Sequence, residues 1–280
     1  MFTPISTTQF VRSTKALFSL GLIALLAACA SAPPLQQPTK AVGAIEIFRS
    51  PLLDRTDHTL QHLDDGKQIL YSQTYGGGGV GVGLLLGPLG VAANIKAIES
   101  NTLKDTALLK NKIKLNPRDI FVSAANKTNT LIATGPAAGN LKLTPYLLTE
   151  KTEGDKIMMA AVLLGDASEK GTFPAKYLVQ IPVSYTIPEL SNLNADQTKL
   201  LGNLLENGFV TLLDRIKKEA SAMTANETKV TFVSEFLTPR FKFEIQANLI
   251  EANQDLVWFR TMTGVFGVKP QDVSYKVVKK

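Results

Sequence analysis

The chain contains two histidines, His58 and His62, which are the first residues to consider for metal or acid–base chemistry. We expect a short helix over residues 57–64, on which a spacing of four puts both imidazole rings on one face. Asp54 lies one turn earlier, and Asp65 follows closely. Two imidazoles and a carboxylate can hold zinc with an open coordination position, as zinc hydrolases require.

The residues around this pair weaken the case for zinc catalysis. Thr59 stands where the H-E-x-x-H motif places the glutamate that acts as general base. Leu60 and Leu63 take the other side of the expected helix, which leaves the two rings in solvent. We therefore expect no catalytic residue and no bound metal. A zinc-dependent hydrolase at His58 and His62 is the third alternative for the function.

Residues 76–90 are the compositional anomaly of the chain, because eight of these fifteen positions are glycine. Residues 76–81 satisfy G-x-G-x-x-G, the pattern of a dinucleotide-binding turn between a strand and a helix. Pro88, however, suits the first position of a helix, and a helix that starts there begins too late for a pyrophosphate site. We expect no cofactor.

Three of these glycines, Gly79, Gly83 and Gly87, are spaced by four. On a helix they would form a flat groove that another backbone can approach closely. The stretch 80–95 carries no charge, yet it is shorter than the ~20 residues that a membrane span needs. One interpretation is a loop that leads into a buried helix start. The other, which we expect at these three glycines, is contact with a partner or a membrane.

Cys29 is the one cysteine of the chain, so no intrachain disulfide can form. Residues 1–28 contain two basic and no acidic residues, an apolar run over residues 16–26, and small residues just before the cysteine. These features are typical of a secretory signal peptide. The motif Leu26-Ala27-Ala28-Cys29 resembles the lipobox of bacterial lipoproteins.

The resemblance implies cleavage before Cys29 and a thioether-linked diacylglycerol on that residue, with palmitate among the acyl chains. Ala30, rather than aspartate, follows the cysteine, which by the sorting rule of enteric-type bacteria implies the outer membrane. Three acyl chains would anchor the mature protein stably. We expect an outer-membrane lipoprotein whose domain faces the periplasm, with the inner membrane or exposure at the cell surface as alternatives.

The remaining sequence divides into a tether and one domain. Residues 29–42 are rich in proline and lack periodicity, as expected for a lipid-anchored tether, and residues 43–280 show no internal linker. The formal net charge of +6 is mild and scattered, so we expect no nucleic-acid partner. The expected partners are the membrane, reached through the lipid, and one or more envelope proteins. A homo-oligomer is an alternative.

Hydrophobic patterning predicts an α+β fold with a mostly antiparallel sheet and two long helices packed on one face. Asn194 and Gln197 form a capping box at the start of the second helix. We expect Leu205, Phe209 and Leu212 of that helix to face the sheet. The expected helices span 88–114 and 194–218, and the expected strands span 44–48, 67–75, 141–150, 156–164, 176–186, 241–249, 256–259 and 273–277.

Two local features refine this expectation. Pro182 and Pro188 place the strand at 176–186 near an edge or end of the sheet. The apolar face of the strand at 241–249 should pack, with Trp258, beneath the second helix; its inward residues include Phe243 and Ile245. Asn116-Pro117 should end the first helix.

The mature domain loosely resembles uncharacterised proteobacterial envelope lipoproteins, through the order of a strand, a glycine-rich segment and a helix, and through the hairpin at 248–263. We expect a non-enzymatic binding or scaffold subunit of an envelope assembly or secretion machine. The alternative is an oligomeric pore-forming or channel subunit whose glycine-rich segment, 76–90, inserts in a membrane or packs against its copies.

Overall fold

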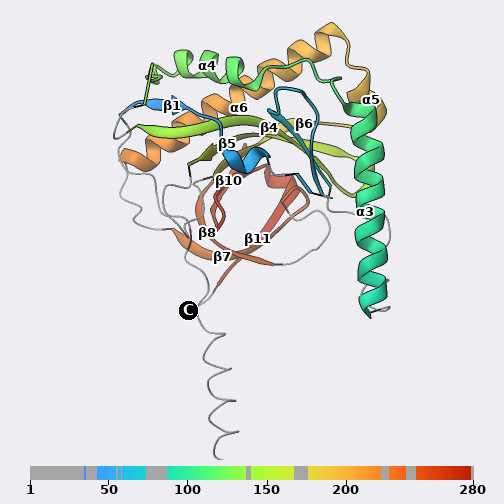
Figure 1. The fold of residues 1–280 in the computed structure, drawn as a ribbon. Coiled ribbons are helices and arrows are strands. Elements are labelled where there is room, and N and C mark those ends of the chain that lie inside the picture. The colour runs from blue at the N-terminus through green and yellow to red at the C-terminus, as the bar shows by residue number, and fades with distance from the viewer. Residues whose placement is uncertain are drawn as a thin grey trace, which may run out of the picture. The chain divides into compact units, whose positions relative to one another are not determined.

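The computed structural model combines a large sheet with four α-helices in its described residues (Figure 1). Residues 35–280 belong to one compact unit. For residues 87–94 the structure describes the helical backbone but not the side chains. The described residues are 35, 43–54, 56–57, 59–73, 87–136, 140–166, 176–221, 227–237 and 244–278.

The sheet has eleven strands in the order β11-β7-β8-β9-β10-β6-β5-β4-β3-β2, with β1 paired to β4 beside this path. The strands are β1 (Ile45–Ile47), β2 (Leu60–His62), β3 (Ile69–Gln73), β4 (Leu141–Lys151), β5 (Ile157–Gly165), β6 (Lys176–Tyr185), β7 (Thr228–Ser234), β8 (Ile245–Ala252), β9 (Val257–Arg260), β10 (Val265–Val268) and β11 (Val273–Val277).

The sheet is mixed, so the prediction of a mostly antiparallel sheet is wrong. β1 and β3 both run parallel to β4, and β10 runs parallel to β6. Long connections cause this, because a chain that crosses over before it pairs again can return in the same direction. Two helices lie between β3 and β4 in the sequence, and two helices with three strands lie between β6 and β10.

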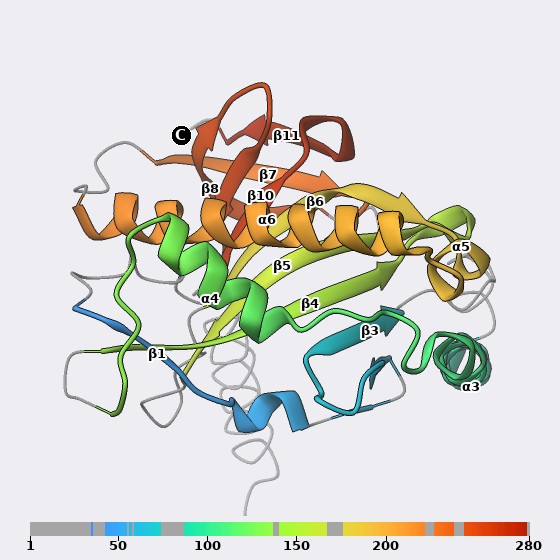
Figure 2. The same ribbon diagram turned by 90° about the horizontal axis from the view of Figure 1, so that it is seen from above.

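The helices do not share one face of the sheet, which corrects the second part of the predicted fold. α6 crosses β5 and β6, and α4 packs between α6 and β4, whereas α3 stands at the far side against α5, β2 and β3 (Figure 2). The described buried residues of α3 form a narrow, half-polar stripe, which suits a sheet edge better than a broad apolar face. The helices are α3 (Gly87–Leu109), α4 (Pro117–Lys127), α5 (Ile187–Ser191) and α6 (Ala195–Ser221).

α6 follows its sequence pattern closely. The Asn194 amide accepts a bond from Gln197 N at 2.8 Å, and Asn194 N donates to Gln197 Oε1 at 2.9 Å, which confirms the capping box. Leu205, Phe209 and Leu212 are buried in the same core as Trp258. Ile245 instead belongs to a separate cluster under the C-terminal strands, and Phe243 lies outside the described residues.

The opposite face of the sheet is also covered, because β7 to β11 curl beneath it (Figure 1). Phe266 and Val268 of β10, together with Phe236, pack there against Met158 and Val162 of β5. All nine residues of β5 are consequently buried, as expected for a strand covered on both faces.

Two local predictions fail for identifiable reasons. Residues 59–64 do not form a helix, because the Asp57 carboxylate accepts from Thr59 N and the chain then enters β2. Asn116 does not merely follow a helix but caps the start of α4, accepting from Arg118 N at 3.1 Å. Pro182 lies in an irregularity near the end of β6, past the residues that pair with β10, which agrees with the expected position near the end of a strand.

Candidate functional site

Of the two histidines of the zinc alternative, one lies within the described residues. His62 is in β2 with both ring nitrogens buried, and this burial lowers its pKa, so the expected solvated face is wrong. His58 lies outside the described residues. Asp54 pairs with Arg49 at 2.9 Å and Lys67 at 3.0 Å, and these two cations lower the pKa of its carboxyl to about 2.

The other expected ligand is also engaged elsewhere. Asp65 lies 3.5 Å from Lys110 and accepts from Asn111 at 3.2 Å. Across the described part of the chain, no three His, Cys, Asp or Glu residues are grouped so that they could hold a metal ion. Cys29, Gly79 and Gly83 lie outside the described residues.

Gly87 opens α3, whose first nine residues carry no charge. The described buried side chains of this helix lie in its second half and include Ile98 and Leu109. No helix of the described residues is both long and apolar enough to cross a membrane.

A buried polar cluster fastens α3 to the sheet. Tyr71 donates to Asp105 Oδ2 at 2.6 Å, and Lys151 Nζ donates to the same oxygen at 2.8 Å. Burial and the neighbouring Asp105 carboxylate raise the pKa of Tyr71 far above its usual value. The three groups come from β3, α3 and β4, so their arrangement joins three elements.

A second buried cluster fastens the end of α6 to β9. Arg260 donates to Glu219 at 2.9 Å and, through Nε, to Glu227 at 2.9 Å. Tyr177 also donates to Glu219, at 3.1 Å, and Arg215 lies over the Trp258 ring. Arg260, Glu219, Glu227 and Tyr177 satisfy one another, as a structural network requires. The buried Nε of Arg215 lies 3.5 Å from Glu219 and has no hydrogen-bond partner among the described residues.

One buried carboxylate is less well satisfied. Glu150, on the face of the sheet turned toward β10, is 7% exposed, and its Oε1 has no hydrogen-bond partner among the described residues. Burial raises the pKa of Glu150 to about 7, although the Ser72 hydroxyl and the charge of Lys176 oppose this shift. Burial also lowers the pKa of Lys176.

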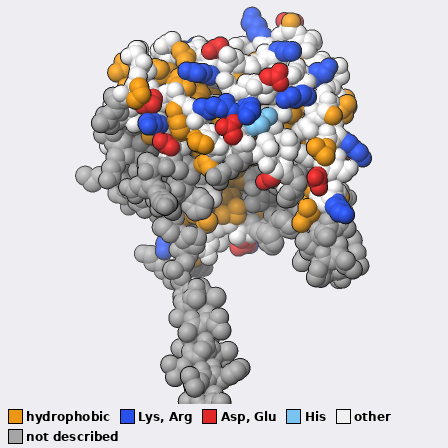
Figure 3. Space-filling model, in the orientation of Figure 1, with side chains coloured by type: hydrophobic (Ala, Val, Ile, Leu, Met, Phe, Trp, Pro, Cys, Tyr) orange, Lys and Arg blue, Asp and Glu red, His pale blue; other side chains and the backbone are white. Residues whose placement is uncertain are grey.

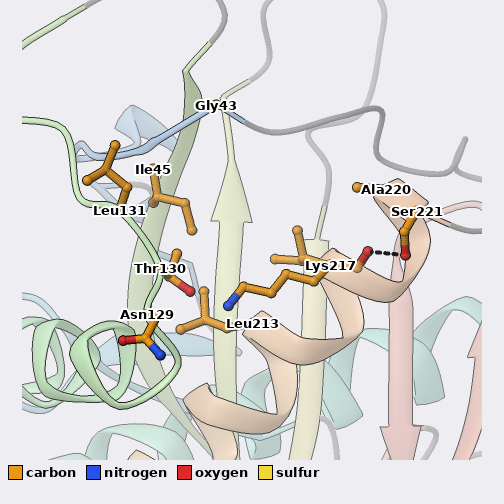
Figure 4. A pocket seen from close by; sticks show the side chains of 10 residues that line it. Gly43, Ile45, Asn129, Thr130, Leu131, Leu213, Lys217, Ala220 and Ser221 are labelled. Carbon is orange, nitrogen blue, oxygen red and sulfur yellow. Dashed lines mark hydrogen bonds between the residues drawn. The ribbon is translucent and has the colours of Figure 1, made fainter.

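A cavity of about 400 Å³ opens between the end of α6, the loop that follows α4 and the start of β1 (Figure 4). This volume is within the range of small-molecule binding sites. The walls are mainly apolar. They are formed by Gly43, Ile45, Asn129, Thr130, Leu131, Leu213, Ile216, Lys217, Ala220 and Ser221.

Local sequence explains each wall of this cavity. α6 contributes residues spaced by three and four, from Leu213 to Ser221, which lie on one helix face. After α4 the chain turns through Asn129, whose φ of 50° is left-handed, and Thr130 N donates back to Ala125 O at 2.8 Å. Ile45 N then donates to the carbonyl of Leu131 at 2.8 Å, which joins this loop to β1.

Few polar groups line the cavity. Lys217 is the one charged residue among those lining it, and its ammonium donates to the Thr128 carbonyl. Leu131 stands at the rim with 69% of its surface exposed. No lining residue offers a carboxylate, imidazole or thiol, so the arrangement suits binding of an apolar group rather than acid–base chemistry.

Sequence reasoning missed this cavity. One signal was present, since the small residues Ala220 and Ser221 continue the inward face of α6 after Ile216. The loop and β1 that complete the cavity lie far away in the sequence.

A second hollow of about 830 Å³ lies between α4 and the first half of α6. It is wide and open, its lining surface is also mainly apolar, and its Glu206 carboxylate accepts from both Ser123 and Lys127. On the face shown in Figure 3, basic and acidic side chains are interspersed instead of gathering into one basic patch.

No family model matches this chain, and it is not significantly similar to any curated protein or any solved structure. Its function is therefore inferred from its own residues.

Proposed function

We propose that this chain is an outer-membrane lipoprotein that binds a partner in the cell envelope and catalyses no reaction. The observation that carries the proposal is the contrast between the cavity and the buried charges. The cavity bounded by Ile45, Leu131 and Ile216 is apolar and open, whereas the buried ionisable clusters around Asp105 and Glu219 hold structural elements together.

The position of the cavity in the chain supports the same function. Gly43 lines it, and Gly43 directly follows the tether at 29–42. An extended tether of this length reaches roughly 40 Å. If Cys29 carries the lipid, the cavity therefore lies within reach of the membrane surface, where an envelope partner or membrane component would be met.

Photocrosslinking in cells tests this proposal. A photoreactive amino acid at Leu131, on the rim, should give a defined adduct in the full, lipidated chain. The matched control is Leu200, which is 52% exposed on α6 but does not line the cavity. Equal adducts at both positions, or none at Leu131, would contradict a binding role for this cavity.

The pore or channel alternative has one observation in its favour. The first nine residues of α3 are uncharged, and in Figure 1 this helix extends past the edge of the sheet. Such an end suits a contact with a partner, a membrane or another copy, and Gly87 starts it. The zinc-hydrolase alternative has no such support, since Asp54 and Asp65 are paired with cations.

A further inference from the structure

We infer that the cavity at the end of α6 binds the hydrocarbon tail of a single-chain amphiphile whose anionic head group lies at Lys217. The inference rests on the proposed binding function and names its ligand. A carboxylate or phosphate head meets the same requirement, so a free fatty acid and a lysophospholipid are two sources of one chemistry.

The floor of the cavity argues for the tail. Ile45, Leu213 and Ile216 form it, and all three belong to the main hydrophobic core. Water against this floor gains few hydrogen bonds, whereas a hydrocarbon chain would remove the apolar surface from water. Each methylene that becomes buried should lower Kd about fourfold, until the cavity is full.

The charges around the mouth argue for an anionic head. Lys217 uses one donor on the Thr128 carbonyl, and an ammonium has three donors. The neighbouring cations are engaged with carboxylates, Lys127 with Glu206 and Lys218 with Glu251. Lys217 is therefore the charge best placed to meet a ligand.

The end of α6 opposes an anion, but more weakly than Lys217 favours one. The carboxyl end of a helix is equivalent to about half a negative charge, against a full positive charge on the ammonium. In addition, the Ser221 hydroxyl donates toward the carbonyls of Lys217 and Lys218, at 2.9 and 3.2 Å, which satisfies part of this helix end.

The rim suits a ligand that comes from a membrane. Leu131 exposes a large apolar side chain beside the mouth, and Gly43 connects the cavity to the tether. A tail could pass from a lipid surface along Leu131 to the floor of the cavity without crossing a charged wall, because no other lining residue is charged.

Calorimetric titration of the full chain tests the inference, in a steroid detergent that has no acyl chain to compete. The probes share a twelve-carbon tail and differ in the head: dodecanoate, lauroyl lysophosphatidylglycerol, dodecanol and dodecyltrimethylammonium. We expect saturable binding of the two anions, about fivefold tighter than dodecanol, with the cation weakest. Decanoate should bind more weakly than dodecanoate.

Binding of dodecanoate alone would identify a free fatty acid, and binding of both anions would extend the ligand to lysophospholipids.

Two variants locate the site. Ala220→Trp should abolish binding by filling the cavity, while the matched Leu200→Trp on the same helix should bind as the native chain does. Lys217→Met should remove the preference for anions and keep the binding of dodecanol. Circular dichroism of each variant verifies the fold.

Undiminished binding by Ala220→Trp, or no saturable binding of any probe to the folded native chain, would overturn the inference. If no probe binds while Leu131 still crosslinks a protein, the ligand is wrong and the proposed binding function stands. If dodecyltrimethylammonium binds most tightly, the assignment of the head group is wrong.

Discussion

The guanidinium of Arg260 and the carboxylate of Glu219 meet at 2.9 Å with only 3% and 1% of their side chains exposed. The pair joins the last turns of α6 to β9, and both attract further partners, Glu227 and Tyr177. Buried charges of this kind stabilise a fold only while they remain paired, because desolvation of each charge is costly. The same end of α6 forms one wall of the apolar cavity, so this pair also positions the candidate site.

Removal of one partner of this pair should therefore destabilise the fold strongly. Arg260→Met leaves the Glu219 carboxylate buried without its cation, and we expect it to lower the free energy of unfolding by about 3–5 kcal/mol. The control is Lys276→Met, which breaks an exposed pair with Glu244 and should cost less than about 1 kcal/mol. Urea unfolding followed by circular dichroism measures both. Similar losses in the two variants would show that burial of the Arg260 pair has no special weight.

Glu150 should make stability depend on pH. Its carboxyl has a pKa of about 7 in the folded chain against an ordinary value of 4.5. The folded state thus holds the proton more tightly, and the free energy of unfolding should fall as pH rises from about 4.5 to 7, by on the order of 3 kcal/mol. Glu150→Gln should remove this decline and stabilise the chain at pH 8, as measured by denaturation across this range.

Glu189 is the control for this prediction, because its pKa is shifted in the opposite direction. Its bonds with the backbone and hydroxyl of Thr186 lower the pKa of its carboxyl, so its contribution is present at neutral pH and is lost as pH falls through the lowered value. Glu189→Gln should therefore leave the decline between pH 4.5 and 7 in place. A Glu150→Gln variant that keeps the full decline would show that another group causes it.

Substitution of two glycines of α6 by alanine should change the stability of the chain in opposite directions. A Cβ at Gly208 would lie 2.8 Å from the Cβ of Ala161, so Gly208→Ala should force α6 away from β5 and cost about 1–3 kcal/mol. At Gly202 the nearest atom, on Leu115, is at an ordinary 3.4 Å, and Gly202→Ala should stabilise the helix by about 0.5–1 kcal/mol. Thermal melts compare the pair, and equal effects would contradict close packing at Gly208.

Lipidation at Cys29 is testable by mass spectrometry of the protein isolated from bacterial membranes. The native chain should begin at an acylated cysteine, whereas Cys29→Ser should retain residues 1–28 and carry no acyl adduct, since the thioether needs the thiol. Density-gradient fractionation should place the native chain in the outer membrane. A normally processed, membrane-bound Cys29→Ser protein would contradict the lipoprotein assignment.

The glycines at 79, 83 and 87 should reveal whether this segment makes a contact. If a groove is packed against a partner or membrane, side-chain size at Gly83 should matter, with Gly83→Ala milder than Gly83→Leu. We expect Gly83→Leu to reduce recovery of envelope complexes in co-purification while circular dichroism stays native. If Gly83→Leu still recovers envelope complexes in full, the contact interpretation is wrong and the segment is better interpreted as a loop.

The features that the sequence predicts correctly are those that short-range interactions control. The capping box joins Asn194 and Gln197, three residues apart, and the apolar stripe of α6 repeats at helical spacing, so both could be read without knowledge of the fold. The strands β4, β5 and β6 were predicted to within about two residues at each end for the same reason. The lipobox at Cys29 is likewise local, and it remains a prediction.

The strand order and the site depend on long-range packing, which local sequence patterns do not reveal. Asn116-Pro117 can end one helix or begin the next, and local sequence is compatible with both. The parallel pairing of β6 with β10 joins segments about ninety residues apart, as Val265 opposite Tyr177 shows, and no local pattern encodes such a pairing. The cavity combines residues 43–45, 129–131 and 213–221 for the same physical reason: its walls are neighbours only after long-range packing has brought β1, the loop after α4 and the end of α6 together.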